Sequence, residues 1–265
     1  MKKVIWLLAL VVSVSACSND DENPIGGDPI NNYYPLKTDN TWKYSVVNEQ
    51  TTTQDVLWVT GETTIAGKNY FTMEAENIPT GFYTTSINGQ SLRNENNTVY
   101  MTGALDFNLG DMFAVNLTLN DFILVKSGAA SSELLSTVSG TMSETFENIP
   151  LTATYTLSTI NQNSLPSYTS EGVVYEDVMV VKFALNMKVV ATVNLGGFPI
   201  NVPVLNSQDV VVSTQYYAKN IGLVHAATTI SYNLQDLSSL PIEIPIPQSQ
   251  MNLSNEYLLD FDQNS

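Results

Sequence analysis

The chain has 265 residues, of which 10 are basic and 26 acidic, and its net charge at pH 7 is −16. Such an acidic chain repels phosphate backbones and has too few lysines and arginines for a nucleic-acid surface, so we expect no nucleic acid as a partner. One cysteine and one histidine are too few for zinc sites built from several such ligands and for a cysteine–histidine nucleophile. We expect no cofactor and no metal, since residues 106–111 begin like a calcium loop but lack the spacing of its ligands.

The first 16 residues have the three-part pattern of a secretory signal peptide. Lys2 and Lys3 precede an apolar run over residues 4–12, and small residues follow. The run is shorter than the roughly 20 apolar residues that a membrane-spanning helix needs. We predict that residues 1–16 are removed, and the loss of two lysines would change the net charge from −16 to −18.

The next segment contains the chain's cysteine. The sequence VSAC, ending at Cys17, resembles the lipobox of bacterial lipoproteins, in which the cysteine is lipidated and becomes the new N-terminus. This resemblance implies that Cys17 carries a lipid anchor that attaches the protein to a membrane. Two or three acyl chains together hold a protein firmly, whereas one alone binds only marginally.

The residues after Cys17 predict a tether and suggest a location. The acidic run over residues 18–22 resembles the signal that sends some lipoproteins of Gram-negative bacteria to the outer surface of the outer membrane. The alternative is a solvated linker, with the protein on the periplasmic face. Two prolines and two glycines within residues 23–32 indicate a flexible chain. We expect a lipidated, acidic tether over residues 17–32 and one folded domain over residues 33–265.

Alternating polar and apolar residues dominate the predicted domain. Residues 185–195 are apolar at every odd position and mostly polar at the even ones, and residues 152–158 and 229–234 repeat the pattern. Strict alternation favours antiparallel strands with one buried face. The sequence therefore predicts an all-β domain, a curved antiparallel sheet that is an open half-barrel or sandwich-like, with little helix.

Three further segments have less regular patterns. Residues 131–135 (SSELL) could open a short helix with a serine cap. The apolar run over residues 240–247 (LPIEIPIP) is interrupted by three prolines and one glutamate. Because proline cannot donate to a strand ladder, we expect this segment on a sheet edge or in a loop. Residues 251–261 are expected to return as a last strand.

Three short motifs carry a resemblance to a known family. They are YYPLKTDNTWKY at residues 33–44, EDVMVV at 176–181 and YYAKNIGLV at 216–224. They resemble motifs of a family of envelope lipoproteins of Gram-negative bacteria: Pro-Leu, a Gly-Asn turn and Trp-x-Tyr near the start, and a Tyr-Ala…Gly-Leu-Val hairpin near the end. The resemblance implies a strongly curved, open half-barrel like those of periplasmic lipoprotein carriers, whose concave face can hold an apolar ligand.

This chain departs from the family pattern at two turns. Asp39 and Asn220 stand where the family usually has glycine. Aspartate and asparagine tolerate left-handed backbone better than other non-glycine residues, so both turns are expected to form. Trp42 and Tyr44 are two apart and share one strand face. Core packing is the favoured role for this pair, and lining of a ligand site is the alternative.

The sequence predicts no catalytic residue. A serine triad would have to use His225, and no Gly-x-Ser-x-Gly motif occurs. His225 follows Gly-Leu-Val in a predicted hairpin, and we expect it at the surface or at a sheet edge. Asp260 and Asp262 share a strand face, and a pair of carboxylates is what a glycoside hydrolase requires.

These patterns lead to three functional hypotheses. The first is a membrane-anchored, non-catalytic binding or carrier module for a hydrophobic small molecule or a glycan. The second is a structural or adhesive protein of the cell surface. The third is a glycoside hydrolase that uses carboxylates alone. The residues that would bind the ligand are not indicated by any motif.

Overall fold

The structure is a computed structural model that describes residues 32–108, 114–146, 148–236 and 247–263. The predicted signal peptide, Cys17 and the tether up to residue 31 lie outside the described residues. The Pro-rich segment over residues 240–247 lies outside them too, apart from its last proline.

The described residues form twelve strands and one short helix, which confirms the all-β prediction. The strands are β1 Thr41–Asn48, β2 Thr52–Ile65, β3 Lys68–Ala75, β4 Ser91–Glu95, β5 Thr98–Asn108, β6 Ala114–Lys126, β7 Leu134–Phe146, β8 Ile149–Ser170, β9 Val173–Leu195, β10 Phe198–Ala218, β11 Gly222–Asn233 and β12 Ser249–Asp262. The helix α1 is Phe82–Ile87. The predicted last strand is β12.

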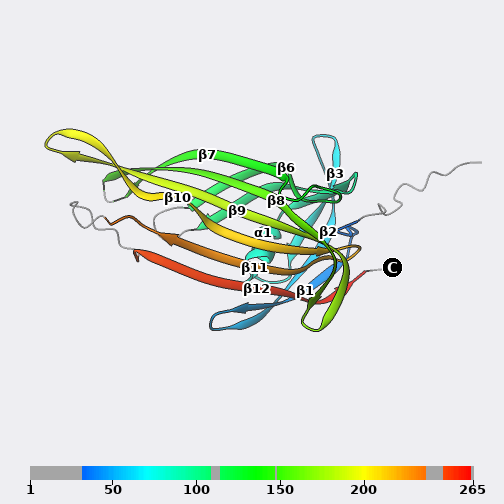
Figure 1. Ribbon diagram of the computed structural model, residues 1–265. Coiled ribbons are helices and arrows are strands. Elements are labelled where there is room, and N and C mark those ends of the chain that lie inside the picture. Colours follow the sequence, from blue (N-terminus) through cyan, green and yellow to red (C-terminus); the bar gives the residue numbers. More distant parts are fainter. Residues whose placement is uncertain (1–31, 109–113, 147, 237–246, 264–265) are drawn as a thin grey trace, which may run out of the picture.

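All twelve strands belong to one antiparallel sheet with the order β6-β5-β4-β3-β2-β1-β12-β11-β10-β9-β8-β7. The sheet curls until its edge strands β6 and β7 face each other (Figure 1). No backbone pairing between β6 and β7 is found in the described chain, but Thr159 of β8 donates a hydrogen bond to the Ile123 carbonyl of β6 at 2.6 Å. The sheet is therefore a nearly closed barrel with one unsealed seam, more curved than the predicted half-barrel and unlike a sandwich.

Alternation and bulges explain the curvature. Leu185, Met187 and Val189 of β9 are at most 2% exposed, as their odd positions predict, so the apolar face of the sheet lies inside. The pairing of β9 with β10 shifts register at three places between Pro203 and Val211. Such bulges bend a strand and increase its twist, which lets long strands wrap around a core.

One end of the barrel, here called the packed end, is filled by large aromatic side chains. Tyr34, Trp42, Tyr44 and Tyr217 are fully buried there. The Trp42 ring lies 4.9 Å from the Tyr34 ring and 5.1 Å from the Phe261 ring. Core packing is therefore the role of Trp42 and Tyr44.

The motifs at residues 33–44 and 216–224 meet at the packed end. Trp42 Nε1 donates to the Ile221 carbonyl at 2.6 Å, and the Tyr44 hydroxyl donates to the Leu223 carbonyl at 3.1 Å. These bonds cross beneath β12, which lies between β1 and β11 in the sheet. Asp39 and Asn220 have φ angles of 69° and 61°, so both turns adopt the left-handed conformation expected of them.

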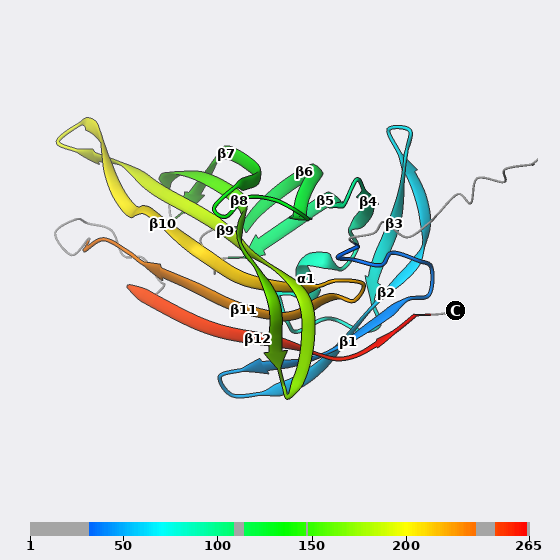
Figure 2. The same cartoon turned by 45° about the vertical axis from the view of Figure 1, so that its right-hand side comes forward.

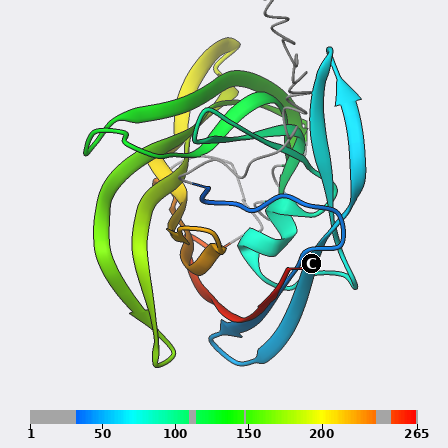
Figure 3. The ribbon, with the colours of Figure 1, turned by 90° about the vertical axis from the view of Figure 1, so that its right-hand side faces the viewer.

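The helix lies elsewhere than the sequence suggests. Residues 131–135 form a turn and the start of β7 because their polar groups pair with β8: Ser132 N donates to the Asn161 carbonyl, and Asn161 N donates to the Glu133 carbonyl. The helix prediction there is wrong. Helix α1 instead follows β3 and lies inside the ring of strands (Figures 2 and 3).

Candidate functional site: a ligand cavity beside helix α1

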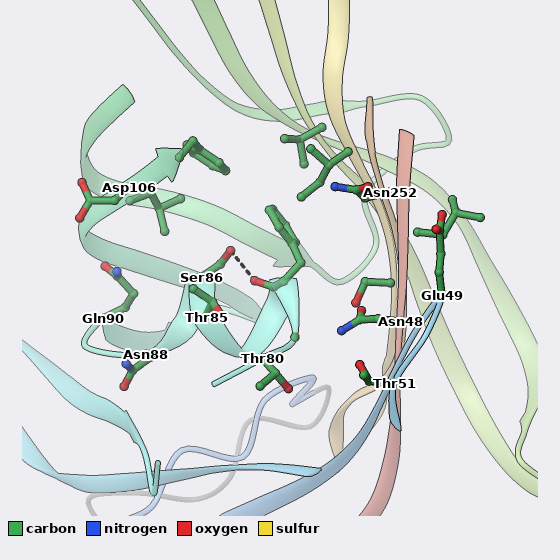
Figure 4. A pocket seen from close by; sticks show the side chains of 18 of the residues that line it. Asn48, Glu49, Thr51, Thr80, Thr85, Ser86, Asn88, Gln90, Asp106 and Asn252 are labelled. Carbon is green, nitrogen blue, oxygen red and sulfur yellow. Dashed lines mark hydrogen bonds between the residues drawn. The ribbon is translucent and has the colours of Figure 1, made fainter. Parts of the chain in front are cut away.

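A cavity of about 890 Å³ lies on the side of α1 away from the packed end. Its walls come from α1, the second half of β5, the turn between β1 and β2, the first half of β12 and single residues of β10 and β11 (Figure 4). Ligand sites commonly have volumes of roughly 300–1,000 Å³. The cavity is therefore large enough for a small organic ligand. We call this region the cavity end.

Apolar side chains form the inner surface of the cavity. Phe82 of α1 and Phe107 of β5 lie with ring centroids 6.2 Å apart and an interplanar angle of 28°. Leu105, Val211 and Ile230 add aliphatic surface. Phe107 is buried, whereas Phe82 is only half-buried and keeps part of its ring toward the cavity.

Polar side chains surround this apolar surface. Figure 4 shows Asp106, Gln90 and Asn88 on one side of α1, and Asn48 and Asn252 on the other. Within the described part of the chain, the side chains of Asn48, Glu49, Thr51, Thr85 and Asn252 make no hydrogen bond with the protein. These groups are available to a ligand.

The charges that line the cavity are all negative. Glu49 and Asp106 are its ionisable side chains, and no lysine, arginine or histidine lines it among the described residues. Asp106 accepts a hydrogen bond from Asn116 at 2.5 Å and is exposed. Glu49 is exposed in the β1–β2 turn, on the side of the cavity opposite Asp106 (Figure 4).

The segment that follows α1 is fixed by two amide side chains. Asn88 Oδ1 accepts a hydrogen bond from Ala75 N of β3 at 2.8 Å, and Gln90 Nε2 donates to the Ala104 carbonyl of β5 at 2.6 Å. Gln90 is 5% exposed and lines the cavity, and its Oε1 has no hydrogen-bond partner in the described structure. It is a buried acceptor at the cavity wall.

The start of α1 is held by two buried carboxylates from distant strands. The helix has no side-chain cap of its own. Asp55 of β2 accepts hydrogen bonds from Thr80 N and Gly81 N, both at 2.8 Å. Glu256 of β12 accepts from Tyr83 N at 2.5 Å and from Thr84 N at 3.0 Å. These bonds satisfy N–H groups that a helix start leaves free, so the carboxylates attach α1 to the sheet on two sides.

Burial changes the protonation of Glu256. The pKa of its carboxyl group is raised to about 7: desolvation and the charge of Asp55 raise it, whereas the hydrogen bonds from Tyr83 and Thr84 lower it. Desolvation is the largest of these effects because Glu256 is only 1% exposed. The attachment of α1 therefore includes a group that titrates near neutral pH.

Neither buried carboxylate was predicted, although the sequence holds a signal for both. Asp55 is in phase with Leu57 and Val59 on the inward face of β2, and Glu256 is in phase with Leu258 on that of β12. A carboxylate on the apolar face of a strand must find donors inside the protein. The sequence does not say which backbone supplies those donors.

The structure separates the carboxylates singled out in the sequence from the cavity. Asp260 and Asp262 are exposed on the second half of β12 and do not line the cavity. Their partners in the neighbouring strand β1 are Lys43 for Asp260 and Thr41 for Asp262. The carboxylates that do line the cavity, Glu49 and Asp106, come from segments in which the sequence indicated no site.

The prediction for His225 is wrong. It lies in β11 between β10 and β12 and is 9% exposed, so it is neither at the surface nor at an edge. Its ring stacks between those of Tyr216 and Tyr257, at 5.2 and 4.6 Å, and the Tyr168 hydroxyl lies 2.6 Å from Nδ1. Burial lowers the pKa of His225. The β8–β9 hairpin, which supplies Tyr168, accounts for this burial.

The fold and the site define the class of protein: a nearly closed, single-sheet barrel with an internal helix and a ligand-sized cavity at one end. The described residues contain no cluster of three or more metal-ligating side chains. They include no helix with the length and apolar character needed to cross a membrane. Comparisons with protein-family models, with curated proteins and with solved structures find no match to this chain.

Proposed function

We propose that this chain is a lipid-anchored envelope protein that binds a small ligand in the cavity beside α1 without transforming it. The observation that carries the proposal is the cavity itself, a space of about 890 Å³ with an apolar inner surface and unpaired polar groups around it. Inward-facing side chains fill the packed end, so the space at the cavity end is a distinct feature of the fold. A hydrophobic small molecule or a glycan fits such a surface.

Attachment to the outer membrane through Cys17 completes the proposal. It is supported by the lipobox-like sequence and by the acidic run that follows it. The intact mass of the mature chain should equal that of residues 17–265 plus fatty acyl groups, and Cys17→Ser should abolish the added mass. Proteolysis of whole cells should remove the protein if it faces outward, whereas protection would place it on the periplasmic face.

Native mass spectrometry of the full chain tests ligand binding. The chain purified from cell envelopes should carry an additional mass that dissociates on activation. Thr85→Trp should abolish this mass because Thr85 is an exposed residue of α1 that lines the cavity, and an indole would fill the space. Glu74→Trp, on an exposed position of β3 outside the cavity, is the matched control. An adduct that both variants keep would contradict the proposal.

One observation favours an adhesive or structural role as a second candidate. The tip of the β9–β10 hairpin extends past the neighbouring strands (Figure 2), and residues 192–201 pair only with each other within the described sheet. Phe198 is 74% exposed and Ile200 39%. No charged residue occurs from Val189 to Gln208, so this arm is an apolar, uncharged surface on an acidic protein, as interaction surfaces often are.

Cross-linking in intact cells tests this second candidate. A photo-crosslinker at Phe198 should join the chain to one envelope protein if the arm is adhesive, and the product should disappear in Ile200→Ser. A crosslinker at the exposed Glu74 is the control for random contact. An absence of products specific to Phe198 would leave ligand binding as the better account.

A further inference from the structure

We infer that the cavity takes a neutral, hydroxyl-rich ligand, a short oligosaccharide without acidic sugars, and discriminates against anions and against plain aliphatic chains. This inference rests on the proposed function and names the ligand class of the same cavity. It follows from the charges, the hydrogen-bonding groups and the aromatic surface that line the space.

The charges of the cavity lining disfavour anionic ligands. Glu49 and Asp106 line the cavity and no cationic side chain does so among the described residues. Both carboxylates are exposed, so water and salt screen the repulsion that they exert on an anion, but an anion that loses its water in the cavity still needs a charged or hydrogen-bonding partner. A fatty acid, a phospholipid or a uronic acid would bring a negative charge next to carboxylates, and the described lining residues include no cation to compensate it.

The hydrogen-bonding groups then favour a ligand that donates. The carboxylates of Glu49 and Asp106 accept hydrogen bonds and have none to donate. The unpaired side chains of Asn48 and Asn252 can both donate and accept. A saccharide presents hydroxyl groups that serve in both senses, whereas an aliphatic chain presents none and would leave these groups desolvated and unpaired.

The aromatic surface fits the less polar face of a sugar ring. Phe82 is stacked loosely on Phe107, 6.2 Å between centroids, and is half-buried at the cavity surface. The C–H groups of a pyranose pack on an aromatic ring while its hydroxyls point sideways. Asp106 and Gln90 lie on one side of the cavity and Asn252 on the other (Figure 4). The ring and the polar walls thus complement one kind of ligand.

A binding panel on the full chain tests the inference. The chain is kept in a polyoxyethylene detergent, because detergents with sugar headgroups would compete for the cavity. Neutral oligosaccharides are compared with counterparts in which a hexose is replaced by a uronic acid, and with a long-chain alcohol and a long-chain fatty acid. Binding to a neutral oligosaccharide should be at least tenfold tighter than to its acidic counterpart and should exceed binding of both aliphatic probes.

Cavity variants show whether the lining is responsible. Asp106→Asn and Asn252→Ala should each weaken binding of the neutral sugar by about fivefold to tenfold, the effect of one hydrogen bond. Thr85→Lys introduces a cation at the cavity wall, so it should reduce the ratio of the affinity for the neutral sugar to the affinity for the acidic sugar. Glu74→Gln changes the same charge as Asp106→Asn outside the cavity and should change neither affinity nor ratio.

The outcomes separate the inference from the proposed function. Equal affinity for neutral and acidic sugars, or binding of the aliphatic probes without any saccharide, would overturn the ligand class while the cavity remained a binding site. Binding unaffected by Thr85→Lys, Asp106→Asn and Asn252→Ala would also overturn it. If no probe binds and the native mass spectrum shows no dissociable adduct, the proposed function fails with it.

Discussion

The packed end and the cavity end use the same sheet in opposite ways. At the packed end, Tyr34, Trp42, Tyr44 and Tyr217 fill the barrel and are fully buried, and their polar atoms are bonded inside. At the cavity end, a space of about 890 Å³ remains, and several of the polar side chains that line it make no hydrogen bond within the described residues. Groups that pair inside the protein stabilise its fold, whereas unpaired groups add little to stability, so the packed end stabilises the barrel and the cavity end holds the proposed ligand site.

Helix α1 is the boundary between the two ends. Tyr83 points into the packed end, where its hydroxyl donates to that of Tyr34 at 3.1 Å, whereas Thr85 and Phe82 line the cavity. Asp55 and Glu256 hold the helix in this position. Substitutions on the two sides of α1 should therefore differ in what they change.

The largest effect on stability is expected for Trp42→Ala. It removes the hydrogen bond to Ile221 and leaves a cavity in the aromatic core, which typically costs about 3–5 kcal/mol. Phe198→Ala removes a ring that is 74% exposed on the β9–β10 hairpin, away from the packed end, and should change the free energy of unfolding by less than about 0.5 kcal/mol. Urea denaturation of both variants measures this, and similar costs would contradict the division of roles.

Gly81→Ala should destabilise the boundary by about 2–3 kcal/mol. An added Cβ would lie 2.3 Å from the Glu256 carboxyl carbon, so this buried carboxylate must shift and its hydrogen bonds with Tyr83 N and Thr84 N are strained or lost. Gly61→Ala is the matched control because its Cβ would have no neighbour within 4 Å. A cost for Gly61→Ala as large as that for Gly81→Ala would show that the Glu256 contact is not the cause.

Glu256 should make stability depend on pH. Its pKa is about 7 in the folded protein against an ordinary 4.5, so between these values the unfolded chain binds fewer protons and the free energy of unfolding falls as pH rises. The expected fall from about pH 5 to pH 7 is roughly 2 kcal/mol. The pKa of His225 is lowered, so its titration makes the free energy of unfolding rise with pH. The contribution of Glu256 must therefore be measured by comparing the native chain with a variant of Glu256.

Glu256→Gln isolates this contribution, because glutamine has the shape of the protonated acid and does not titrate. As pH rises, the free energy of unfolding of the native chain should therefore fall relative to that of Glu256→Gln. Parallel pH curves would mean that Glu256 does not change its protonation near neutral pH.

The smallest effect is expected for Thr85→Ala. Thr85 is exposed, makes no side-chain hydrogen bond within the described residues and borders the cavity. Its free energy of unfolding should change by less than about 0.5 kcal/mol. Thermal unfolding measures this, and a loss comparable to that of Gly81→Ala would mean that the cavity face of α1 is structural.

The strands could be predicted because their signal is local. Alternation over residues 185–195 identified the buried face of β9, and the spacing of Trp42 and Tyr44 placed both side chains in the core. Local patterns did not predict how far the sheet would curl, because Pro203 is the single residue near the three register shifts of β10 whose type favours a bulge.

The helix and the cavity could not be predicted because their causes are distant in the chain. The N–H groups of α1 are satisfied by Asp55 and Glu256, the latter 173 residues from Tyr83, and the cavity combines residues of several elements. His225 shows the same limitation: its place after a turn suggested exposure, but Tyr168 from another hairpin contacts its ring. Local sequence predicts elements, whereas these features arise from their assembly.

Hydrogen exchange with and without a neutral oligosaccharide tests the account most directly. Binding in the cavity should slow amide exchange in the β1–β2 turn, around Glu49–Thr51, and in the second half of β5, while peptides that contain Trp42 or Leu223 at the packed end keep their rates. Protection confined to the packed end, or equal at both ends, would contradict a ligand site beside α1.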